Sequence, residues 1–179
     1  MTGSDDEAGL GQVAQLAEPL LSEPRRVTGR AFTWREGSWT PYLPPDDHPA
    51  HEQFLRLLCL SAASDYADQQ EALNERLSAA GDDLFVASVM LVEGTSKGLI
   101  SLCSWTQGVV TLLPRTDRIA FVSPGEGDHP SNVMQVPWDE AIAVVGDLMK
   151  PQGLRPERWR VDAFPTPEEL SALQGRAVS

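Results

Sequence analysis

The chain has 179 residues, 41% of them hydrophobic and 22% charged, which is enough apolar material for one buried core and excludes a wholly disordered polymer. Its 26 acidic and 14 basic side chains give a net charge of −12, which repels phosphate backbones and disfavours a nucleic-acid partner. The same charge favours basic peptides, cationic protein faces or divalent metals as partners. No run approaches the roughly 20 apolar residues of a membrane span, so we expect no membrane contact.

Cysteine usage indicates the compartment. Cys59 and Cys103 both lie in apolar runs, where a thiol behaves as a small hydrophobe. Two cysteines do not make a disulfide framework. Residues 1–9 are acidic and lack the basic region of a signal peptide. Together these features predict a cytoplasmic protein.

The first 24 residues carry a weak helical stripe of leucines that Pro19 interrupts and Pro24 ends. We therefore predict a flexible N-terminal tail over 1–24, with at most one short helix. Residues 25–179 are predicted to form a single α+β domain. If the tail is ordered, its leucines need a groove, which a second subunit could supply.

Residues 31–43 have the pattern of a β-hairpin. Phe32 and Trp34 alternate on one arm, Trp39 lies on the other, and a Glu-Gly pair supplies the turn. Arginines are interleaved with the rings, at Arg25, Arg26, Arg30 and Arg35. Rings beside guanidinium groups can hold single-stranded nucleic acid. The simpler interpretation is that the rings fill one side of the hairpin and the arginines offset local acid.

A long helical pattern follows, from Ala50 to Ala80, which fits one bent helix or two. Gly81 is well suited to end it. Residues 84–92 are apolar on both alternating faces, which predicts one central strand buried on two sides.

Shorter strands are predicted at 99–106, 109–113, 118–122, 133–136 and 158–163. Their connections are short, whereas parallel crossovers need a dozen residues or more, so antiparallel neighbours are favoured. A helix beginning at Pro137 is expected to bury one face, formed by Trp138, Ile142, Val145 and Met149.

The clearest local signal is the capping box of Thr166 and Glu169, which starts a short C-terminal helix. Helices grouped around an antiparallel sheet define the α+β class. We expect an antiparallel sheet of about four to six strands with helices packed on one face.

A metal site is the strongest catalytic hypothesis, resting on His48, His51 and Glu52, with Asp46 and Asp47 beside them. The helical zinc motif needs histidines at i and i+4, whereas these stand at i and i+3. A third ligand would have to come from elsewhere, from Glu126, Asp128 or His129. A polar helix start, where acids complement the helix dipole, explains the cluster better, so we expect no metal.

Other catalytic signatures are weak. The chain has no Gly-x-Ser-x-Gly elbow, and cysteines in buried runs are inert. Residues 94–98 lack the spacing of a phosphate loop and fit a hairpin turn. Paired acids flank helix ends, where they serve as caps. We therefore expect no catalytic residue and no cofactor.

Tryptophan and arginine are the residues most enriched at interface hot spots. The interaction candidates are Trp34, Trp39, Trp105, Trp138, Arg158, Trp159 and Arg160. We favour a non-enzymatic protein-interaction module, such as an adaptor, a chaperone-like module or an inhibitor of a basic protein partner. A homodimer through the sheet or the helix of 138–149 is expected. The alternative is an enzyme of an unrecognised family, possibly metal-dependent, that uses His48, His51 and nearby acids.

Overall fold

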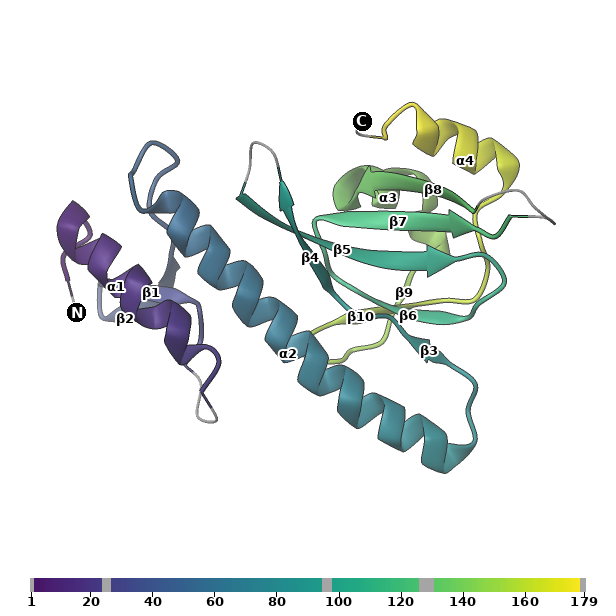
Figure 1. Ribbon diagram of the computed structural model, residues 1–179, viewed down its shortest axis with the longest axis horizontal. Coiled ribbons are helices and arrows are strands. Elements are labelled where there is room, and N and C mark those ends of the chain that lie inside the picture. Colours follow the sequence, from purple (N-terminus) through teal and green to yellow (C-terminus); the bar gives the residue numbers. More distant parts are fainter. Residues whose placement is uncertain (1, 24–26, 95–97, 126–130, 178–179) are drawn as a thin grey trace. The chain divides into compact units, whose positions relative to one another are not determined.

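The computed structural model describes residues 2–23, 27–94, 98–125 and 131–177, which form two compact units. Unit 1 comprises Met1–Ser64 and Glu93–Ile100, and unit 2 comprises Asp65–Val92 and Ser101–Ser179. Within the described residues there are four α-helices, one sheet of two strands and two sheets of four (Figure 1). The predicted α+β class is confirmed. The predicted division into tail and single domain stays a prediction.

Unit 1 is built from helix α1 (Glu7–Leu20), the hairpin of β1 (Ala31–Arg35) and β2 (Ser38–Tyr42), and the first part of helix α2 (His51–Ala80). The side chain of Asp6 caps α1 by accepting a hydrogen bond from the Gly9 amide at 2.9 Å. The core of unit 1 is apolar and consists of Leu10, Ala14, Leu21, Ala50, Phe54 and Leu57. Residues in the predicted tail thus contribute a helix and core side chains.

The predicted hairpin is confirmed, with its turn at Glu36 and Gly37. The two residues have φ of 50° and 81°, the left-handed conformations that a two-residue type I′ turn requires. Gly37 adopts this conformation without a steric penalty, whereas Glu36 is a non-glycine residue in a conformation that such residues seldom adopt.

The long helical segment is one helix, α2, of 30 residues. It ends before Gly81, whose φ of 72° is the usual left-handed C-terminal conformation. None of the described helices is both long and apolar enough to cross a membrane.

The strands after α2 form two mixed sheets, with orders β3-β6-β10-β9 and β4-β5-β7-β8. Their bounds are β3 (Phe85–Val86), β4 (Met90–Gly94), β5 (Gly98–Thr106), β6 (Thr111–Pro114), β7 (Arg118–Ser123), β8 (Asn132–Pro137), β9 (Lys150–Pro151) and β10 (Arg158–Val161). The β5–β7 and β3–β6 pairs are parallel, and the β7–β8, β10–β6 and β10–β9 pairs are antiparallel. The chain can run parallel from β5 to β7 because β6, in the other sheet, lies in the connection.

The prediction of one buried strand over 84–92 is wrong. The segment forms two short strands, β3 and β4, which lie in different sheets and at the edge of each. Phe85, Met90 and Val92 are 50%, 42% and 42% exposed. A continuous apolar run predicts burial on both faces, but edge strands of this length leave one side open.

The core of unit 2 lies where helices α3 (Trp138–Val145) and α4 (Pro167–Gln174) pack against the β7–β8 part of the sheet (Figure 1). Trp138, Val145 and Met149 are buried as predicted, but Ile142 is 38% exposed and Ala141 is buried in its place. The buried stripe runs at i, i+3 and i+7, so Ile142 falls at its border. The predicted capping box at the start of α4 is confirmed.

Candidate functional site

The β1–β2 hairpin has two chemically different faces. Trp34 pairs with Trp39 and Phe32 with Pro41 across the strands, so these four side chains share one face. Ala31 and Tyr42 lie on the other face, and that face packs against the core of unit 1. The face of Phe32, Trp34, Trp39 and Pro41, here called the aromatic face, therefore points away from the core.

The aromatic face is open to solvent. Phe32 is 47%, Trp34 57% and Trp39 58% exposed. In an antiparallel pair with one covered face, the covered side is normally apolar and the solvent side polar. This hairpin is inverted, because its largest apolar side chains are on the solvent side. Exposed apolar patches of this kind are typical of interaction sites.

Trp34 and Trp39 are arranged edge to face, with ring centroids 5.2 Å apart and planes at 63°. Such a cross-strand pair stabilises a hairpin by roughly 0.2–1 kcal/mol, so part of its role is structural. The rings do fill one side of the hairpin, as the simpler interpretation held. About half of the surface of these rings is open to solvent, which the simpler interpretation did not anticipate.

Arg35 does not lie beside the rings. Arg35 pairs with Ser38 and so belongs to the face opposite the aromatic face. Arg30 precedes β1, and Arg25 and Arg26 lie outside the described residues. Rings and arginines alternate in the sequence, but Arg35 and the rings lie on opposite faces of the hairpin. This removes one reason to expect a nucleic-acid partner.

Three of the predicted interaction residues are core residues. Trp105, Trp138 and Arg158 are 1%, 2% and 0% exposed, so they have no surface to offer a partner. The side chain of Trp159 is partly buried and packs edge to face on Trp138, with ring centroids 5.0 Å apart. These large rings therefore serve to fill the core of unit 2, and their presence in the sequence does not require an interface.

Arg160 is exposed, and its Nε donates a hydrogen bond to Asp162 at 2.6 Å. An exposed ion pair of this kind adds little to stability or binding. Of the seven candidates, Trp34 and Trp39 are the two that the structure brings together on an open surface. Phe32 and Pro41 complete that surface and were not among the interaction candidates, although their period-two spacing with the tryptophans is visible in the sequence.

Arg158 is buried and bound by neutral acceptors. Its Nε donates to the Gln69 side chain at 2.6 Å, and its Nη1 donates to the carbonyls of Ala87 and Leu112 at 2.7 and 3.1 Å. Its Nη2 donates to the Tyr66 carbonyl at 3.1 Å. Burial lowers the pKa of Arg158 to about 10, which still leaves it protonated at neutral pH. The side chain joins α2 to two strands of unit 2.

The histidines at the start of α2 have structural partners. His48 Nδ1 accepts a hydrogen bond from the Ala50 amide at 3.0 Å, which helps the chain turn into the helix. His51 is buried, and its Nδ1 donates to the Pro44 carbonyl at 2.7 Å. Its Nε2 lies 3.6 Å from Asp46 Oδ1.

The weak metal alternative of His48, His51 and Glu52 is not supported. Nowhere in the described part of the chain do three or more His, Cys, Asp or Glu side chains come together as metal ligands would. The i,i+3 spacing with an intervening proline directs the two histidines to separate backbone partners. The third-ligand candidates Glu126, Asp128 and His129 lie outside the described residues.

Cys103 is buried in the core of unit 2, and burial raises the pKa of its thiol to about 12. Thr116 Oγ1 donates a hydrogen bond to its Sγ at 3.3 Å. A neutral thiol in an apolar core is not a nucleophile.

This burial predicts an alkaline loss of stability. The Cys103 thiol ionises near its ordinary pKa of 9 in the unfolded chain but stays protonated up to about 12 in the folded one. The folded state therefore holds an extra proton between these pH values, so stability is complete below pH 9 and falls as the pH rises. From pH 8 to 10.5, wild type should lose about 2 kcal/mol more unfolding free energy than Cys103→Ala, measured by urea unfolding. Equal losses in the two proteins would contradict the burial argument.

Comparison with protein-family models, with curated proteins and with solved structures gives no match for this chain.

Proposed function

We propose that the chain is a non-enzymatic protein-interaction module that binds a basic segment of a protein partner through the aromatic face of the β1–β2 hairpin. The observation that carries the proposal is the inversion of this hairpin, with Phe32, Trp34 and Trp39 about half exposed while Ala31 and Tyr42 face the core. Exposed aromatic rings contribute large contact areas at a low entropy cost, which is why they dominate interface hot spots.

Charge supports a basic partner. The net charge of −12 draws cationic segments toward the protein and repels acidic ones. The aromatic face can then hold a cation directly, because the ring face of tryptophan is the best aromatic acceptor for lysine and arginine. None of the four side chains of the aromatic face is charged, so an approaching cation meets no local repulsion from them.

The size of the aromatic face favours a short segment. Three rings that are about half exposed offer roughly 300 Å² of contact area. Stable complexes of folded proteins bury about 800 Å² on each partner. An extended basic segment of a few residues matches the smaller area better than a folded domain does.

Two further expectations accompany the proposal. We expect the module to act in the cytoplasm, where it would meet a basic protein partner under reducing conditions. The homodimer stays a prediction that is separate from the aromatic face. One of the two surfaces predicted for the homodimer is the helix of 138–149. The apolar face of this helix, α3, packs into the core of unit 2.

The test is a selection of displayed random 12-residue peptides on the 179-residue protein. We expect enriched peptides to carry a net positive charge and to bind at least tenfold more weakly to Trp34→Thr/Trp39→Thr. Threonine favours strands and keeps the hairpin, so the loss should come from the rings. Raising the NaCl concentration from 50 to 500 mM should weaken binding further, because salt screens the charge attraction.

The matched control is Leu16→Ser/Leu20→Ser, which removes two other exposed apolar side chains of unit 1, 69% and 44% exposed, on α1. This variant should bind the enriched peptides as wild type does. The proposal is wrong if no charged preference emerges, or if the threonine variant binds the selected peptides unchanged. Circular dichroism spectra of both variants verify that the fold is kept.

A further inference from the structure

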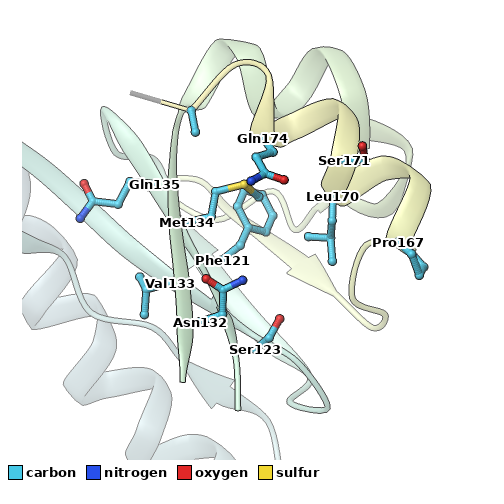
Figure 2. Close-up of a pocket in the computed structure, with 11 residues that line it drawn as sticks. Phe121, Ser123, Asn132, Val133, Met134, Gln135, Pro167, Leu170, Ser171 and Gln174 are labelled. Carbon is cyan, nitrogen blue, oxygen red and sulfur yellow. The ribbon is translucent and has the colours of Figure 1, made fainter. Parts of the chain in front are cut away.

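Unit 2 carries a groove of its own, distinct from the aromatic face. It is a hollow of about 500 Å³ between α4 on one side and strands β7 and β8 on the other (Figure 2). Phe121, which is 2% exposed, lies at its base. A hollow of this volume is in the range of ordinary ligand sites.

One wall of the groove is an edge strand. β8 is the last strand in its sheet order and pairs with β7. Four consecutive residues of β8, 132–135, line the hollow. Figure 2 shows Val133 and Gln135 pointing away from the side on which Met134 lies, so at these two positions it is the main chain that faces the hollow. Because β8 is the last strand of the sheet, the edge that does not pair with β7 presents backbone groups without a strand partner in the described chain.

The facing wall is one side of a helix. Pro167, Leu170, Ser171 and Gln174 of α4 line the groove at positions i, i+3, i+4 and i+7. This spacing puts the four side chains on one face of α4. An edge strand opposite a helix face is the geometry in which an extended peptide is added to a sheet as a further strand.

The lining is uncharged and has unused polar groups. It combines apolar side chains such as Met134 and Leu170 with the amides of Asn132 and Gln174 and the hydroxyl of Ser171. Within the described residues, none of these three polar side chains makes a hydrogen bond to another part of the chain. The first acidic residues of α4, Glu168 and Glu169, do not line the groove.

We propose that this groove binds an extended, uncharged peptide segment of a protein partner as an added strand on β8. The lining has no charge to pair with a buried lysine or glutamate, so a charged segment would lose its hydration without compensation. A neutral strand matches the groove, since its main chain pairs with β8 and alternate side chains meet Met134 and Leu170. A second copy of the chain fits less well, because two molecules of charge −12 repel each other.

The experiment titrates the full chain, labelled with ¹³C at its methionine methyl groups, with capped neutral pentapeptides Ac-Thr-X-Thr-Y-Thr-NH₂, where X and Y are Val, Leu, Phe or Tyr. The Met134 methyl signal is expected to shift. Each binding peptide is then N-methylated either at X and Y or at the three threonines. Because a strand pairs through alternate residues, one of these two forms should bind at least tenfold more weakly and the other about as before.

Two variants locate the site. Ser171→Trp fills the groove from the exposed face of α4 and should abolish the Met134 shift. Ala172→Trp, at the next residue and outside the lining, should leave the Met134 shift unchanged. The proposal is overturned if no pentapeptide shifts Met134 at millimolar concentration, if both N-methylated forms bind like the parent, or if Ser171→Trp binds unchanged. Trp34→Thr/Trp39→Thr should bind the pentapeptides normally, so the groove and the aromatic face succeed or fail independently.

Discussion

Arg158→Met is expected to lower the free energy of unfolding by about 3 kcal/mol, the largest effect of any single substitution that we anticipate. Methionine keeps an unbranched apolar side chain as far as the position of Nε but removes the guanidinium group and with it every donor. The Ala87 carbonyl and the Gln69 side-chain oxygen then lose donors at 2.7 and 2.6 Å in a buried site. A buried polar group without a partner costs more than the hydrogen bond itself contributed.

The matched control for Arg158 lies on the same strand, β10. Arg160→Met removes an arginine whose partner is exposed, and it should change the stability by no more than about 0.5 kcal/mol. Both variants are measured by urea unfolding followed through tryptophan fluorescence. Equal effects at the two positions would show that the Arg158 network does not hold α2 to the sheets of unit 2.

Gly29→Ala is expected to destabilise unit 1 by at least about 2 kcal/mol. A β-carbon at this position would lie 2.1 Å from the carbonyl oxygen of Leu57 and 2.8 Å from Cβ of Ser61, both on α2. Backbone cannot move aside as a flexible side chain can, so the segment before β1 would have to leave the helix. Hydrogen exchange of α1 and the β1–β2 hairpin should accelerate accordingly.

Gly11→Ala is the control for Gly29. Position 11 lies within α1, where a β-carbon would meet nothing within 4 Å. Alanine is a better helix former than glycine, so this variant should be as stable as wild type or up to about 1 kcal/mol more stable. If both alanine variants behave alike, the close approach of Gly29 to α2 is not a requirement of the fold.

Features that depend on local chemistry could be predicted from the sequence. The turn at Glu36 and Gly37 and the capping box of Thr166 and Glu169 follow from backbone conformations and hydrogen bonds within four residues. The end of α2 at Gly81 is of the same kind. Such signals are independent of tertiary context, so the structure reproduces them.

Features that depend on tertiary context could not be predicted from the sequence. Period-two alternation shows that Phe32 and Trp34 share a face, but not whether the core lies on that face or on the other. Apolar content shows that 84–92 is strand-like, but not that it breaks into two edges. The role of Arg158 depends on acceptors 46 to 92 residues away in the sequence, which no local pattern contains.

The aromatic face is the part of this account on which the function depends. The most direct test is hydrogen–deuterium exchange of the full chain with and without the strongest basic peptide from the selection. The account predicts protection concentrated in residues 31–42, the two strands that carry Phe32, Trp34 and Trp39. Protection elsewhere, with the exchange of 31–42 unchanged, would contradict it.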